Sequence, residues 1–170
     1  MRPAILLMKQ KTHKNEVFGG AEKRSFSRQY EIVPEIATAD MCFRAFGASL
    51  EEAFANAGFA MFDIICDANR IKPIVTEEIK VESEDLQALL FDFLSELLYL
   101  QDTKRLLFSE FDVKIIKPKD KNGKYKLAAK ARGQEMDGIG LRNQVKAITY
   151  HLMEIKEEKG VWTIRAILDL

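Results

Sequence analysis

The chain has 170 residues, which suits one domain, and 47% of them are apolar, enough for an ordinary globular core. Its 26 basic and 26 acidic residues balance, so the chain as a whole is no obvious polyanion binder. Two cysteines make no disulfide framework, no apolar run is long enough for a transmembrane helix and no secretory signal is present, so we expect a reduced, cytoplasmic protein.

Charge divides the chain into a basic leader and a mildly acidic body. Residues 1–28 carry seven Lys/Arg against two Glu, a net charge of +5, and the remainder therefore carries −5. The leader shows no sustained hydrophobic periodicity, so we expect it to be flexible, or else Met8 to be the true start. We expect residues 29–170 to form a single domain.

The body opens with two predicted strands and a helix. The segment YEIVPEI is a short strand that Pro34 holds to a sheet edge, because proline cannot donate to the ladder. The segment DMCFRAFG, residues 40–47, alternates with a period of two. A helix is predicted over 49–66, where Ser49 and Glu52 form a capping box. Its apolar residues recur at helical spacing: Leu50, Phe54, Ala57, Met61 and Ile65.

A second strand and helix follow. The segment EEIKVES predicts a strand with Ile79 and Val81 facing inward. The second helix is predicted over 84–101, with Glu84 and Asp85 in its first turn, where negative charge suits the macrodipole. Its inner stripe consists of Leu86, Leu90, Phe93, Leu97 and Leu100.

The rest of the chain reads as β-structure. The strands FDVKIIK and KYKLAAKAR flank Asn122-Gly123, a type I′ hairpin signal. A Gly-rich segment precedes the strand VKAITYHLMEIK, and a turn at Lys159-Gly160 leads to the last strand, VWTIRAILDL. Strands clustered after the helices predict an α+β fold, with a mostly antiparallel or mixed sheet and both helices packed on one face.

The usual enzyme signatures are absent. The sequence has no phosphate-binding or dinucleotide-binding glycine motif, no nucleophile elbow and no Cys/His cluster suited to zinc. A nucleophilic pair of Cys66 and His151 has no motif behind it, and a buried structural cysteine is the favoured interpretation. Lys146 by itself reads as a solvated strand lysine.

Carboxylates at the two ends of the body remain. Asp40 opens one predicted strand, and Asp169 closes another beside Leu170. If these strands lie together, both acids and the carboxylate of Leu170 meet at one sheet end, and such hard oxygen ligands suit calcium or magnesium. From the residue pattern alone, two separate solvated acids are the favoured interpretation.

Residues 30–170 nevertheless resemble the archease family, the protein partner of the RtcB-type RNA ligase. The blocks that carry the resemblance are TADMCFRAFGASLEEAFANAGFAMFDIICD, EDLQALLFDFLSELLYLQDTKRLLFSEFDV, QVKAITYHLMEI and the ending ILDL. Their order and spacing are those of the family, over about five-sixths of the chain.

The resemblance implies a function. Archeases assist the ligase that joins tRNA halves, by promoting its guanylylation and multiple turnover, and they are not known as stand-alone enzymes. Family members bind a divalent cation, typically calcium although magnesium or another ion remains possible, at positions that match Asp40, Asp169 and Leu170. The family's strand lysine, tyrosine and histidine correspond to Lys146, Tyr150 and His151. The resemblance also points to the aspartate after the first helix, Asp67, as a candidate in ligase activation.

The chain departs from the family pattern at two places. Ala37 stands where the family usually has histidine, and the 138–144 loop lacks another family histidine. A free-standing metal-dependent hydrolase, using Asp40 and Asp169 with acids such as Glu135 and Asp137, is the alternative function. Pure RNA binding has less support, because the body is acidic and shows no motif that combines stacking and basic residues.

Overall fold

The computed structural model describes residues 29–34 and 40–170, so the expected leader over residues 1–28 lies outside the described residues, as does Ala37. The element order is the predicted one, ββαβα followed by four strands. The elements are β1 (Tyr30–Val33), β2 (Asp40–Gly47), α1 (Leu50–Ile65), the 3-10 turn η1 (Ala68–Arg70), β3 (Val75–Ser83), α2 (Leu86–Lys104), β4 (Leu106–Ile116), β5 (Tyr125–Glu135), β6 (Ala147–Glu158) and β7 (Val161–Asp169).

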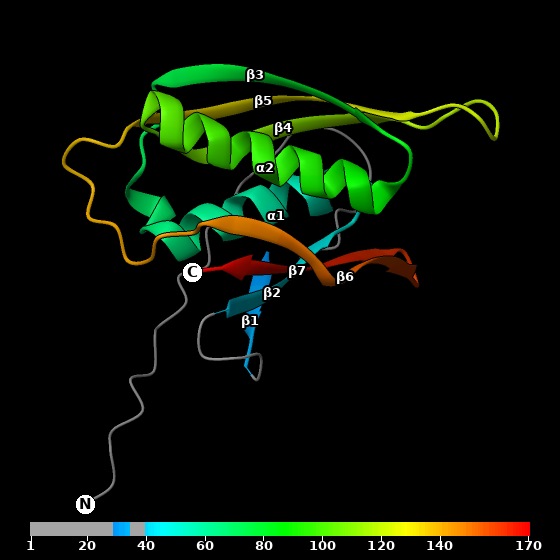
Figure 1. The fold of residues 1–170 in the computed structure, drawn as a ribbon, viewed down its shortest axis with the longest axis horizontal. Coiled ribbons are helices and arrows are strands. Elements are labelled where there is room, and N and C mark those ends of the chain that lie inside the picture. The colour runs from blue at the N-terminus through cyan, green and yellow to red at the C-terminus, as the bar shows by residue number, and fades with distance from the viewer. Residues whose placement is uncertain (1–28, 35–39) are drawn as a thin grey trace, which may run out of the picture.

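The described strands pair antiparallel in two sheets, and the α+β class is confirmed. One sheet has the order β1-β2-β7-β6 and the other the order β3-β5-β4. Both helices lie in a layer between the sheets, so they cover the inner face of each rather than one face of a single sheet (Figure 1). The reason is that α1 buries residues around most of its circumference, and therefore needs apolar partners on two sides.

Side-chain caps define where the helices begin. Ser49 caps α1, its Oγ accepting the Glu52 N–H at 3.1 Å, while the Glu52 carboxylate accepts the N–H of Ala48 at 2.8 Å. The second helix starts later than predicted, because the Asp85 carboxylate accepts the Ala88 N–H at 2.7 Å and is itself the cap. The predicted placement of two acids in its first turn is therefore wrong.

The predicted hairpin forms between β4 and β5, but the prediction of a type I′ turn at Asn122-Gly123 is wrong. A type I′ turn needs positive φ at both central residues, and neither of these has it. Instead the paired strands end at Ile116 and Lys126, and the Asp120 carboxylate accepts the Asn122 N–H at 3.0 Å inside a longer loop. The positive-φ pair occurs at Lys159-Gly160, with φ of 53° and 78°, in the predicted turn between β6 and β7.

The predicted core is confirmed. The inner stripes of both helices pack between the two sheets, and Phe54, Met61, Leu90, Phe93 and Leu97 are each 0% exposed. The two cysteines are buried and free. No helix in the described part of the chain is long and apolar enough to cross a membrane.

Phe93 offers a direct test of the middle layer. Phe93→Ala should lower the free energy of unfolding by about 3–5 kcal/mol, because the ring is fully buried and leaves a cavity. The matched control is Tyr99→Ala on the same helix, where a side chain that is 58% exposed should cost less than about 0.5 kcal/mol. Urea unfolding of both variants measures this, and equal losses would contradict the assignment of the core face.

Candidate functional site

The two ends of the body meet where β2 pairs with β7. Asp40 and Asp169 are directly opposite each other in this antiparallel pair, as the sequence predicted for strands lying together. Residues opposite one another in such a pair share a face, with Cβ atoms about 4.5–5.5 Å apart. Ala147 of β6 is the next member of the same row, so the row crosses three strands and its two acids lie on the neighbouring strands β2 and β7.

The acids project from the outer face of the four-stranded sheet. Phe43 and Leu168 belong to the core that α1 covers, and both lie at odd spacing from the acids along their strands. Because side chains alternate along a strand, Asp40 and Asp169 face away from α1. Both are half-buried, and neither carboxylate has a hydrogen bond or ion pair within the described part of the chain.

Lys146 completes this edge of the sheet. Its N–H donates to the main-chain oxygen of Asp169 at 2.8 Å, and its Nζ donates to the main-chain oxygen of Leu170, also at 2.8 Å. The lysine therefore lies at the same end of the sheet as the two acids. Its ammonium is exposed and contacts Leu170, which is one of the three residues considered as ligands for a cation.

The donor set fits a hard cation, although it is small. Two carboxylates and a main-chain oxygen provide the oxygen atoms that calcium and magnesium prefer. Like charges directly opposite each other in a sheet repel, so a bound cation would reduce the electrostatic repulsion between the two carboxylates. Within residues 29–34 and 40–170, no group of three or more His, Cys, Asp or Glu side chains is placed to hold a metal, since only two such side chains meet here.

Tyr150 and His151 lie in a bulge further along β6, away from the acid pair. The register of β6 against β7 shifts between Thr149 and Glu154, and Leu152 within the bulge has a φ of 54°. The Arg165 side chain donates to the Leu152 carbonyl at 2.8 Å and holds this conformation, which is strained for a bulky residue.

The bulge places the side chains of Tyr150 and His151 in different surroundings. Tyr150 stacks on Phe91 of α2, with ring centroids 4.2 Å apart, so it lies on the helix side of the sheet. Desolvation and the charges of Asp92 and Asp85 raise the pKa of the Tyr150 phenol. His151 is exposed, and its N–H donates to the Thr149 hydroxyl at 3.1 Å.

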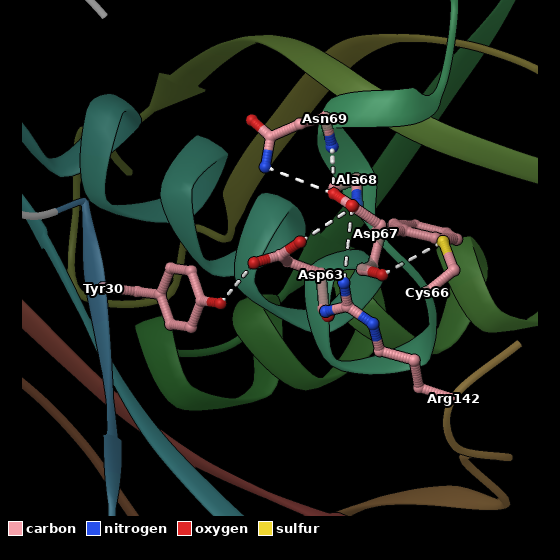
Figure 2. Close-up of polar contacts among 8 residues, drawn as sticks. Tyr30, Asp63, Cys66, Asp67, Ala68, Asn69 and Arg142 are labelled. Carbon is pink, nitrogen blue, oxygen red and sulfur yellow. Dashed lines mark hydrogen bonds and ion pairs between the residues drawn. The ribbon is translucent and has the colours of Figure 1, made fainter. Parts of the chain in front are cut away.

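Asp67 belongs to a second polar cluster, at the end of α1 (Figure 2). Its carboxylate accepts the Asn69 N–H at 3.2 Å and caps η1, and it pairs with the Arg142 guanidinium at 3.4 Å. Arg142 comes from the loop before β6, and its main-chain N–H donates to the Ile65 carbonyl at 2.7 Å. Sequence reasoning missed Arg142, because no local motif marks a loop arginine that closes on a distant helix end.

Tyr30 and Asp63 extend the same cluster towards β1 (Figure 2). The Tyr30 hydroxyl donates to one Asp63 oxygen at 2.5 Å, and the other Asp63 oxygen accepts the Ala68 N–H at 3.0 Å. Burial, this hydrogen bond and the charge of Asp63 raise the pKa of the Tyr30 phenol. Burial likewise raises the pKa of the neighbouring Cys66 thiol to about 11, which keeps it protonated and unreactive.

The loop that carries Arg142 also lines an open cleft of about 480 Å³ beside the end of α2. Gln101, which is 5% exposed, lies in its wall, and its Oε1 has no hydrogen-bond partner among the described residues. The sequence gives no signal for this residue, because the cleft is lined by residues that are far apart in the chain.

The groups considered for the alternative chemistries do not converge. Asp137 pairs with Arg105 at 3.3 Å beyond the end of β5, whereas Asp40 lies on the other sheet. Cys66 donates its thiol hydrogen to the Phe62 carbonyl at 3.3 Å, and His151 lies exposed in the β6 bulge. The structure therefore does not bring Asp137 to the pair of Asp40 and Asp169, and it does not assemble the Cys-His pair.

Comparisons with known proteins agree with the resemblance. Residues 30–170 match the family described as Archease protein family (MTH1598/TM1083). The chain is 42% identical over 134 residues to Protein archease of Methanothermobacter thermautotrophicus, covering 78% of this chain and 94% of that protein. It is 43% identical over 136 residues to Protein archease of Pyrococcus furiosus, with the same shares covered.

A solved structure shares the fold. The solution structure of Methanobacterium thermoautotrophicum Protein 1598 is 39% identical in sequence and superposes with a TM-score of 0.71. The match covers 84% of this chain and 99% of that one.

The contact between Tyr30 and Asp63 makes a pH-dependent prediction. Tyr30→Phe should lower the free energy of unfolding by about 1.5–3 kcal/mol, because a partly buried carboxylate loses its donor. The raised pKa means that the folded protein keeps the phenolic proton where the unfolded chain releases it, so this stability is present below pH 10 and is lost above it.

Urea unfolding at about pH 8 and about pH 11 measures both effects. The gap between wild type and Tyr30→Phe should narrow as the pH rises. Tyr99→Phe, at an exposed tyrosine, serves as the control and should show no gap at either pH. A gap for Tyr30→Phe that stays constant would mean that its phenol titrates normally.

Proposed function

The chain belongs to the archease family, and on this premise we propose that it is a metal-binding accessory protein of an RtcB-type RNA ligase in tRNA splicing. In this role it promotes guanylylation of the ligase and its multiple turnover, and meets the tRNA halves only through the ligase. It performs no chemistry of its own. The observation that supports the proposal most is the convergence of Asp40, Asp169, Leu170 and Lys146 at one sheet edge.

The proposed metal ligands are Asp40, Asp169 and Leu170, and the proposed ion is calcium, with magnesium or another divalent cation as the alternative. A bound divalent cation would neutralise two carboxylates that otherwise repel across the β2–β7 pair. Because Asp169 ends β7 and Asp40 begins β2, this would also hold the end of β7 to the start of β2.

Lys146 is the proposed contact for ligase activation. Its ammonium is exposed and anchored by one hydrogen bond to Leu170, so it can turn to a partner without disturbing the core. We call the sheet edge formed by Asp40, Asp169, Leu170 and Lys146 the acid edge. Tyr150, His151 and Asp67 remain further candidates, but they lie outside it, in the β6 bulge and at the end of α1. A free-standing hydrolase has less support, because its additional acids lie elsewhere in the fold.

The metal ligands can be tested by titrating calcium into the apoprotein in a calorimeter. Asp40→Asn should weaken calcium binding by at least about tenfold, because it removes one charged ligand and keeps the shape. Adding two glycines after Leu170 should also weaken it, by displacing the terminal charge.

Asp112→Asn is the matched control, since Asp112 is an exposed strand acid on the other sheet and should leave calcium affinity unchanged. Unfolding curves of all variants establish that each is folded. Indistinguishable affinities in wild type and both edge variants would mean that the acids are separate surface groups.

Ligase activation can be tested by mixing the protein with its own RNA ligase and following guanylylation with and without calcium. Lys146→Ala should reduce the stimulation while changing the free energy of unfolding by less than about 1 kcal/mol, since its ion contact is exposed. Lys156→Ala, at an exposed lysine further along the same strand, is the control and should stimulate like wild type. Equal stimulation by all three proteins would remove Lys146 from the proposed site.

A further inference from the structure

Lysines gather at the end of the molecule opposite the acid pair. The loop between β4 and β5 and the start of β5 contain one acid, Asp120, against five exposed lysines: Lys117, Lys119, Lys121, Lys124 and Lys126. Figure 1 shows this hairpin reaching outward at one end of the long axis, while the C-terminus lies towards the other end.

The register of the three-stranded sheet adds two lysines to this end. Ala128 lies two residues beyond Lys126 along β5, and its partners on the neighbouring strands are Lys80 and Lys114. All three side chains are exposed on the outer face of the sheet. Further from the loop the rows carry acids, since Lys130 lies between Glu78 and Asp112. Charge therefore changes along the sheet, and the hairpin end is the basic one. We call the seven lysines the basic end: Lys80, Lys114, Lys117, Lys119, Lys121, Lys124 and Lys126.

Few carboxylates neutralise the basic end. Glu82 is shared by Lys124 at 3.8 Å and Lys126 at 3.2 Å, and both contacts are exposed. Within the described part of the chain, no ion pair engages Lys119 or Lys121. Exposed like charges at this density repel one another, and association with a polyanion would relieve the repulsion.

The basic end is also joined to the four-stranded sheet. The Lys117 ammonium lies 5.8 Å from the centre of the Trp162 ring, at the start of β7. Trp162 and Asp169 are at opposite ends of that strand, about 23 Å apart at the usual rise per residue. One strand thus separates the basic end from the acid pair, and a partner could contact one without covering the other.

We propose that the basic end binds the phosphate backbone of RNA. The proposal rests on the proposed function, because an RNA ligase brings its substrate to the protein that activates it. The acid edge would then serve the ligase, while the basic end holds RNA through charge and without reading bases. Flexible lysines on a loop suit phosphate groups at variable positions, since each ammonium acts as a point charge.

The test is the salt dependence of binding to a short single-stranded RNA of mixed sequence, followed by fluorescence anisotropy with the full-length protein. The variant Lys119→Gln/Lys121→Gln should bind less tightly at every salt concentration. If both lysines contact phosphates, the slope of log affinity against log salt should fall by about 1.4. Neither side chain has a structural partner in the described part of the chain, so the fold should be unaffected.

The control variant, Lys72→Gln/Lys104→Gln, changes the net charge equally at exposed lysines away from the hairpin. It should keep the wild-type slope, and the basic leader is present in all three proteins. Equal slopes in all three, or no binding by wild type, would overturn the proposal. Competition by an acidic polypeptide that is as effective as RNA of equal charge would also overturn the proposal, because the surface would then bind acidic proteins.

Guanylylation of the ligase without RNA separates this inference from the proposed function. The hairpin variant should stimulate that step like wild type, because its lysines are remote from the acid edge. Loss of RNA binding with guanylylation intact supports the basic end as an RNA contact. If wild type binds RNA as described but never stimulates guanylylation, the proposed function fails and the RNA contact remains.

Discussion

The register between β2 and β7 is the constraint on which the rest of the structure depends. Phe43 and Ala166 are opposite each other and fully buried, so the core selects this pairing. A slip of one residue would turn the whole apolar set of β2 outward. The same register places Asp40 opposite Asp169, so burial of the apolar core also brings two like charges together. The proposed cation compensates for a cost that the core imposes.

Placing both helices between two sheets leaves the outer face of each sheet free for polar groups. On the four-stranded sheet that face carries the acid pair at one end, and on the three-stranded sheet it carries lysines at the other. The whole chain has zero formal net charge, and this balance conceals the separation of the two signs in space. A protein with the proposed role, between a ligase and its RNA, could use both surfaces at once.

The loop before β6 connects the two polar clusters. Cys66 forms an isolated bridge with Leu141, and the Asn143 amide donates to the Ile64 carbonyl at 2.7 Å, so the loop is fixed to the end of α1. A few residues later Lys146 contacts Asp169 and Leu170. The loop therefore keeps its place through amide and guanidinium contacts.

The sequence by itself determined the element order, the core stripes and the candidate ligands, because hydrophobic periodicity and the family's blocks are local properties of the chain. It predicted the meeting of Asp40 and Asp169 only on the condition that their strands lie together, since pairing between distant segments depends on the packed core.

Only the tertiary structure decided that the strands divide into two sheets, that Tyr150 turns to Phe91 while His151 faces solvent, and that the hairpin lysines form a basic end. Each of these depends on cross-strand register, on a bulge or on the closing of a loop. Their energies come from contacts between residues far apart in the chain, which no local pattern records.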